Sequence, residues 1–190
     1  MNFFDNNMTS PEILGMAIYF ETLEIFYIGK NDLDLNLLHD KNKKYSFPPN
    51  LKELGIGNNF NQYTNIFISK NLELENIKSL FVNGDRFTSL KIFENIKFKQ
   101  LEELWVRGDK DKGYLTDIKD INYIQGKETI KKIVLKQNRI NNIEELVNII
   151  SSFPNLNLLN LEDNKIDKKK IEKIINQIKL KGFEKLKIKY

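Results

Sequence analysis

The sequence predicts an α/β solenoid of about seven stacked repeats, with short parallel strands on one face and helices or irregular segments on the other. Three observations predict this fold. A short apolar motif recurs at intervals of 24 to 29 residues along most of the 190-residue chain. A short amide or acidic side chain follows most copies of the motif, where the chain must turn. The connecting segments near the C-terminus have helical periodicity.

The repeated motif has apolar residues at positions one, four, six and eleven and asparagine at position nine. Two stretches match it at every defined position, Ile130-x-x-Ile133-x-Leu135-x-x-Asn138-x-Ile140 and Leu156-x-x-Leu159-x-Leu161-x-x-Asn164-x-Ile166. Five further stretches match it in part. The seven copies begin at Leu23, Leu51, Ile77, Leu101, Ile130, Leu156 and Phe183. Because one repeat cannot bury its apolar side alone, consecutive copies should stack into a continuous core.

In this motif the chain resembles the leucine-rich-repeat superfamily, of the intracellular type, from about residue 23 to the C-terminus. The resemblance implies a horseshoe-shaped solenoid whose strands line a concave face, with protein binding as the commonest role. We therefore expect a single domain. Residues 1–22 should form an N-terminal tail and capping helix, and residues 23–190 should form the solenoid.

Position nine of the motif lies where the chain turns after each strand. A short amide there can hydrogen-bond backbone groups of adjacent turns that would otherwise be buried without partners. An ionised carboxylate accepts hydrogen bonds but cannot donate them, so turns with aspartate should be less fully satisfied. The residues at this position are Asn31, Asn59, Asp85, Asp109, Asn138 and Asn164.

Two connecting segments near the C-terminus are predicted to be helical. Apolar residues between positions 143 and 153 follow helical spacing, with Asn142 and Glu145 placed as a capping box. Those between positions 171 and 178 do the same after Asp167. The N-terminal connecting segments lack this spacing and should be irregular, apart from a short helical turn after Thr88.

The two ends of the solenoid are predicted to differ. Ser10 and Pro11 can start a helix that runs to about Thr22 and covers the first repeat, while residues 1–9 should be loose. At the other end the last strand has an exposed edge. Lysines alternate with apolar residues along it, at Lys185, Lys187 and Lys189, and such lysines discourage edge-to-edge aggregation.

A partner-binding site is predicted on the concave face. Side chains alternate in a strand, so positions three, five and seven of the motif point away from the core. Phe81 and Trp105 should lie about 5 Å apart on adjacent strands, with Tyr27 about 10 Å beyond Phe81. Aromatic residues and arginine are enriched at binding hot spots, and we expect Trp105 to face solvent. The predicted contact residues are Tyr27, Phe81, Glu103, Trp105, Arg107, Lys132, Val134 and Lys136. The alternative is that these aromatic rings only pack on one another across neighbouring strands.

The residues that catalysis requires are scarce in this sequence. It has no cysteine and one histidine, His39, so nucleophilic catalysis with a histidine base is not expected. No catalytic residue, metal or cofactor is predicted. Asp109, Asp111 and Gly113 partly match a calcium loop with Asp120 as the twelfth ligand, but the glycine is one place early. A solvated insertion is the preferred interpretation of that segment.

The net charge of +4 is unevenly distributed. Residues 165–189 carry ten lysines against three acidic residues, so the rest of the chain is slightly acidic. The lack of cysteine, of a signal peptide and of a long apolar stretch leads us to expect a cytoplasmic protein without a membrane segment.

A monomeric, non-catalytic protein-interaction module is the expected function. Two alternatives remain at this stage. One is an inhibitor or immunity protein that occludes a partner enzyme. The other, which is less favoured, is nucleic-acid binding through the basic C-terminal end.

Overall fold

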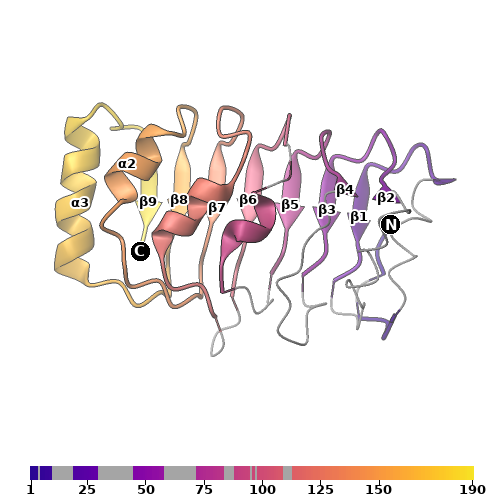
Figure 1. The fold of residues 1–190 in the computed structure, drawn as a ribbon, viewed down its shortest axis with the longest axis horizontal. Coiled ribbons are helices and arrows are strands. Elements are labelled where there is room, and N and C mark those ends of the chain that lie inside the picture. Colours follow the sequence, from indigo (N-terminus) through magenta and orange to yellow (C-terminus); the bar gives the residue numbers. More distant parts are fainter. Residues whose placement is uncertain are drawn as a thin grey trace.

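The computed structural model describes residues 1–3, 5–9, 19–29, 45–57, 72–83, 88–94, 96, 98–108 and 113–190. Seven short strands among these residues form one parallel sheet, and they lie side by side in chain order (Figure 1). The strands are β1 (Ile25–Tyr27), β3 (Glu53–Gly55), β5 (Ser79–Phe81), β6 (Glu103–Trp105), β7 (Lys132–Val134), β8 (Leu158–Asn160) and β9 (Lys187–Lys189). The parallel solenoid predicted from the repeats is confirmed.

The register of the first six strands is the one that the motif predicts. Each strand covers motif positions three to five, and equivalent positions pair across every neighbouring strand. Position four points into the core in all six repeats, and its side chain is fully buried. These residues are Phe26, Leu54, Leu80, Leu104, Ile133 and Leu159.

The last repeat departs from the predicted frame by two residues. Ile188, and not Leu186, pairs with the position-four residue Leu159. Lys187 and Lys189 therefore occupy positions three and five, whereas position five had been assigned to Lys187 and position seven to Lys189. The stretch from Phe183 offers both Leu186 and Ile188 for the core position, and the structure places Ile188 there.

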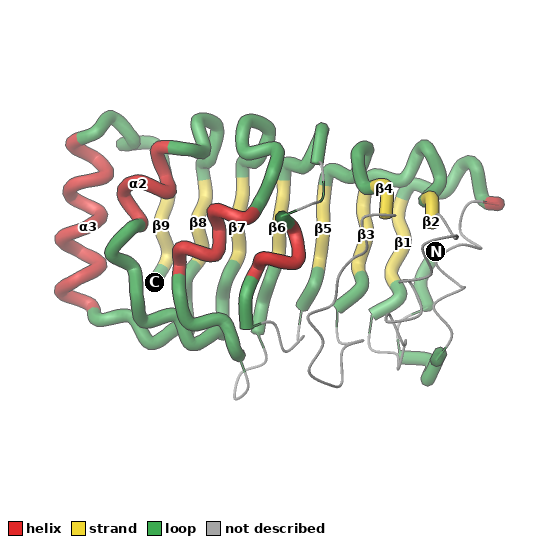
Figure 2. Tube along the Cα trace, viewed as in Figure 1, coloured by secondary structure: helices red, strands yellow, loops and turns green. Residues whose placement is uncertain are grey.

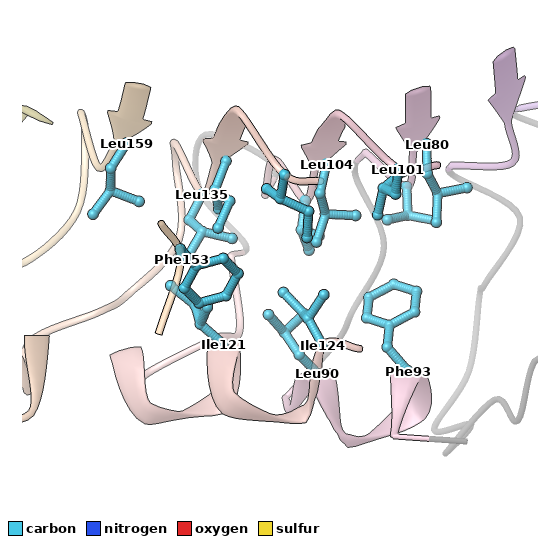
Figure 3. Close-up of a cluster of buried hydrophobic side chains, with 14 of the residues drawn as sticks. Leu80, Leu90, Phe93, Leu101, Leu104, Ile121, Ile124, Leu135, Phe153 and Leu159 are labelled. Atoms are coloured by element: carbon cyan, nitrogen blue, oxygen red, sulfur yellow. The ribbon is translucent and has the colours of Figure 1, made fainter. Parts of the chain in front are cut away.

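Helical segments cover one face of the sheet (Figure 2). They are the 3₁₀ helices η3 (Leu90–Phe93) and η4 (Ile118–Tyr123) and the α-helices α2 (Leu146–Ser151) and α3 (Lys168–Leu180). Side chains from the strands and from these segments point toward one another and form the core between the two layers (Figure 3). Nearer the N-terminus, β2 (Tyr45–Ser46) and β4 (Leu72–Glu73) pair as a second, two-stranded parallel sheet, which the sequence did not predict.

The ends of helix α3 agree with the prediction, whereas those of helix α2 do not. Asp167 caps α3 by accepting a hydrogen bond from the Lys170 N–H at 2.7 Å, and Gly182 after the helix has φ +92°. Helix α2 is shorter than predicted and has no side-chain cap. Asn142 instead accepts a hydrogen bond from the Glu144 N–H, which forms a local turn in place of the capping box.

Asparagine at position nine ties neighbouring repeats together, as predicted. The Asn138 amide donates to the carbonyl oxygens of Val106 at 2.9 Å and Leu135 at 3.1 Å. One repeat later, the Asn164 amide donates to those of Leu135 and Leu161, both at 2.9 Å. Each amide thus bonds the position-six carbonyl of its own repeat and of the preceding one. The four other position-nine residues lie outside the described residues.

A second row of asparagines precedes the strands, and the sequence interpretation missed it. Asn50, Asn76 and Asn155 each stand immediately before the first apolar residue of a motif. Each donates to a backbone carbonyl 27 to 29 residues earlier in the chain. This second row fixes the spacing of the repeats where the strands begin, as position nine does where they end.

The N-terminal residues are not loose, in contrast to the prediction. Asn2 pairs in parallel with Tyr27 of β1, and the Phe3 N–H donates to the Tyr27 carbonyl at 2.7 Å. The Phe3 ring packs edge-on against Phe26, with ring centroids 6.1 Å apart. Most of the predicted capping helix lies outside the described residues. Phe20, which falls near the end of the predicted helix, is 46% exposed.

The segment predicted as a solvated insertion contains η4, which is partly buried. Asp120 is 6% exposed and accepts hydrogen bonds from the Ser89 hydroxyl and the Leu90 N–H at the start of η3. Burial raises the pKa of the Asp120 carboxyl, and these hydrogen bonds oppose that rise. Asp120 therefore joins η3 to η4, and its carboxylate is not directed to a calcium ion. Asp109 and Asp111 lie outside the described residues.

The sheet is open and uncurled. The horseshoe shape that the resemblance implies is not confirmed. We therefore call the sheet surface formed by motif positions three, five and seven the outer face, and not a concave face.

Candidate protein-binding site

Three aromatic side chains at motif position five form a continuous row on the outer face, which we call the aromatic row. Phe81 and Trp105 stack with ring centroids 5.5 Å apart and an interplanar angle of 30°. The separation matches the prediction for adjacent strands. Tyr27 meets Phe81 edge-on, with centroids 6.1 Å apart and an angle of 72°. All three rings are half-buried, so Trp105 is less open to solvent than predicted.

Tyr27 lies closer to Phe81 than predicted, although β3 separates their strands. The reason is Gly55, which occupies position five of β3 and has no side chain to fill the gap. A Cβ atom at Gly55 would clash with the Tyr27 ring, so the ring leans over the glycine to reach Phe81. The predicted distance of about 10 Å assumed that Tyr27 stands upright on its strand.

Replacing Gly55 with alanine tests this arrangement. We expect Gly55→Ala to displace the Tyr27 ring and separate it from Phe81. The thermal stability should change little, because the clash is with the side of a mobile ring and not with backbone. Nuclear Overhauser contacts between the Tyr27 and Phe81 rings would report the change. Their persistence in the alanine variant would contradict the proposed role of the glycine.

Glu103 and Lys132 hold Trp105 in place. The Trp105 indole N–H donates to Glu103 Oε2 at 3.0 Å, and the Lys132 ammonium donates to the same oxygen at 3.1 Å. The Lys132 Nζ atom also lies 4.3 Å from the centroid of the Trp105 ring, in a cation–π contact. These three predicted contact residues therefore form one cluster whose polar groups are already paired.

The other predicted contact residues lie farther along the sheet. Arg107 is exposed, and its Nε atom donates to Gln137 Oε1 at 2.6 Å. The Lys136 Nζ atom lies 3.6 Å from Glu162 and 3.4 Å from Asp163. Val134 is only 2% exposed and offers almost no surface to a partner, so its place among the contact residues was wrong.

Glu53 is a candidate site residue that the sequence interpretation passed over. It lies at position three of β3, in register with Ile25 on one side and Ser79 on the other. Burial and, to a smaller extent, the negative charge of Glu103 raise the pKa of its carboxyl group. The only signal in the sequence is an acidic residue two places before Gly55, in a row that also contains Glu103.

The rest of the described chain offers little that resembles a chemical site. No group of three or more histidine, cysteine, aspartate or glutamate side chains within it could hold a metal ion. A pocket of about 250 Å³ lies among Leu161, Asp163, Asn164, Ile166, Lys168 and Tyr190, and none of the predicted contact residues lines it. No helix in the described ranges is long and apolar enough to cross a bilayer.

Comparisons with known proteins found likenesses among solved structures. No family model and no curated protein matches the chain. Among solved structures, a leucine-rich-repeat protein of Leptospira interrogans is similar, with 19% sequence identity and a TM-score of 0.44. The alignment covers 98% of this chain and 53% of that one, so the chain spans about half the length of that protein. The in-register parallel strands and the asparagine pairing between repeats together define a fold of the leucine-rich-repeat type.

Proposed function

We propose that the chain is a non-catalytic protein-interaction module that binds its partner on the outer face, centred on Phe81 and Trp105. The aromatic row is the observation that supports this proposal. Three aromatic rings lie side by side on a face that no helix in the described residues covers, and Ile25 beside them is 44% exposed. A contiguous patch of this kind on a soluble chain is typical of an interaction surface.

The packing of the aromatic row is compatible with binding. The stacked rings, the indole hydrogen bond and the Lys132 contact fix the side chains before a partner arrives. Less side-chain entropy is then lost on association, which favours affinity. The alternative interpretation was that the rings only pack on one another across neighbouring strands. In this proposal that packing preorganises the binding site, so it is compatible with a binding role.

The distribution of lysines makes nucleic-acid binding the weaker candidate. Lys187 and Lys189 lie on the outer face, whereas the lysines of α3 lie on the helical layer that covers the other face. The two groups do not form one continuous basic groove of the kind that tracks a phosphate backbone.

Capture from the native cell tests the proposed site. We expect wild-type protein to retain a specific partner and Trp105→Ala to bind it at least tenfold more weakly, because a central aromatic residue commonly contributes more than about 1.4 kcal/mol to binding. Isothermal titration with the identified partner would give the two affinities. Tyr123→Ala, which removes a ring from η4 on the helical layer, is the matched control and should bind as the wild type does.

Thermal unfolding of both variants would show whether a loss of binding reflects a loss of folding. An affinity of Trp105→Ala within threefold of the wild type would remove Trp105 from the proposed site.

A further inference from the structure

We propose that the partner presents a cationic side chain, with arginine as the best fit, to Glu53 at the edge of the aromatic row. This inference rests on the proposed function, because it assigns the chemistry of the partner at the same face. The observations that support it are the unpaired state of Glu53, the negative charge next to it and the apolar surface on either side.

Glu53 differs from the two other glutamates on this face in having no polar partner. Glu103 accepts hydrogen bonds from Trp105 and Lys132. Glu162 accepts one from the Asn160 amide and pairs with Lys136. The Glu53 carboxylate forms no hydrogen bond or ion pair with any described residue, although the residue is half-buried. A carboxylate that has lost part of its hydration and gained no partner destabilises the folded protein.

The surrounding charges leave a negative region around Glu53. Glu103 occupies the same motif position two strands away, with only the short side chain of Ser79 between them. Lys132 is the cation one strand beyond, and it is already bonded to Glu103. A positive charge supplied from outside would relieve both the incomplete hydration of Glu53 and its repulsion by Glu103.

The apolar surface beside Glu53 fits an arginine better than a lysine. Ile25, in register with Glu53, is 44% exposed and can cover the aliphatic stem of the incoming side chain. Tyr27 and Phe81 offer ring surface two motif positions away, on the strands to either side of β3. A planar guanidinium stacks on such rings and binds a carboxylate through two hydrogen bonds, whereas an ammonium is a compact and strongly hydrated charge.

Removing the charge of Glu53 should not harm the free protein. The pKa of the Glu53 carboxyl group in the folded state lies above its ordinary value. The folded state therefore binds the proton more tightly than the unfolded state does, and this contribution to stability is lost as the pH rises through the folded-state pKa. Glu53→Gln has no carboxyl group at this position, so its stability does not fall in this way as the pH rises. Its midpoint of thermal unfolding should equal or exceed that of the wild type at pH 7, and the difference should shrink toward pH 4. A lower midpoint at pH 7 would indicate that Glu53 has a structural partner.

A set of four synthetic peptides tests the choice of cation. The capped nonapeptides have leucines flanking a central residue, which is arginine, lysine, citrulline or glutamate, and are otherwise identical. Trp105, the only tryptophan of the chain, reports binding through its fluorescence. We expect the arginine peptide to bind wild-type protein at least tenfold more tightly than the citrulline peptide, which has the same shape without the charge. The lysine peptide should fall between them.

Two charge-neutralising variants assign the effect to Glu53. Glu53→Gln should reduce the preference for arginine over citrulline to less than twofold. Glu144→Gln removes the same charge from an exposed side chain just before α2, on the helical layer, and should leave the preference unchanged. A preference that persists in Glu53→Gln, equal binding of the arginine and citrulline peptides, or no arginine-peptide binding at millimolar concentration would each overturn the inference. None of these results would touch the proposed function, which depends on capture of the native partner by the wild type and its loss in Trp105→Ala.

Discussion

Replacing Leu104 with alanine is expected to lower the free energy of unfolding by about 3 to 4 kcal/mol. Leu104 lies at the centre of β6, the middle strand of the sheet, and its side chain is fully buried. Its register partners Leu80 and Ile133, on the strands to either side, are equally buried. Neighbours held by two sheet ladders cannot move in to fill the space, so a cavity should remain in addition to the lost burial.

Urea unfolding followed by circular dichroism would measure this loss. Leu186→Ala is the matched control, because it makes the same change in the terminal repeat, where Leu186 is only partly buried. We expect the control to lose about 1 kcal/mol, in proportion to the smaller area it buries. Equal losses in the two variants would contradict the stacked core described here, in which the inner repeats are covered on both sides and the last on one.

The register of the first six strands could be predicted because the residue at position four is apolar in each repeat. Such a residue must enter the core, and a one-residue slip would turn it outward. Where position nine is described, its asparagine also bonds two repeats and fixes the turn, as Asn138 and Asn164 show. In the last repeat Leu186 and Ile188 alternate with lysines, so a frame shifted by two residues also buries an apolar side chain, and there the predicted frame was wrong by two residues.

Features that depend on residues distant in sequence could not be predicted in the same way. Two such features join segments whose sequences share no repeated pattern. One is the pairing of Asn2 with Tyr27, and the other is the set of hydrogen bonds that Asp120 accepts from Ser89 and Leu90. No periodicity in the sequence encodes such contacts. The row formed by Asn50, Asn76 and Asn155 is different, because an amide before three motif starts is a visible repeat that the interpretation overlooked.

The neighbours of the aromatic rings on the outer face were predicted in part, but the pairing of the charged side chains was not. Strand alternation and register placed Phe81 beside Trp105 correctly. Whether a charged side chain forms a hydrogen bond or ion pair depends on its length and conformation. The alternation of side chains along a strand predicts only the face on which the residue lies. Glu103 was therefore predicted only as a contact residue, and its carboxylate is bonded to the indole N–H. Glu53 was given no role, and its carboxylate is the one without a partner. The lean of Tyr27 depends likewise on the absence of a side chain at Gly55.

Replacing Asn138 with aspartate is expected to lower the free energy of unfolding at pH 7 by about 4 kcal/mol, the largest effect of any substitution considered. Asn138 is 8% exposed, and its amide donates to the carbonyl oxygens of Val106, Leu135 and Lys136. A carboxylate has nearly the same shape but donates nothing. It would leave these acceptors without their donor and place a negative charge among them.

The loss from Asn138→Asp should depend on pH. Burial beside carbonyl oxygens raises the pKa of the introduced carboxyl group above its ordinary value of about 3.9. The folded variant then binds the proton more tightly than the unfolded chain. Its deficit relative to the wild type should be smallest below about pH 4 and should grow as the pH rises through the folded-state pKa. Urea unfolding of both proteins at pH 4 and pH 7 would measure the two deficits.

Asn138→Ala separates the charge from the lost hydrogen bonds, because it removes the donor without adding a carboxylate. We expect its deficit to be about 2 kcal/mol and equal at the two pH values. A deficit for Asn138→Asp that equals that of Asn138→Ala and does not change with pH would mean that solvent reaches this turn. If the deficit of Asn138→Ala were small as well, the position-nine amide would contribute little to holding the repeats together, and the apolar positions alone would have to set the spacing of the strands that carry the aromatic row.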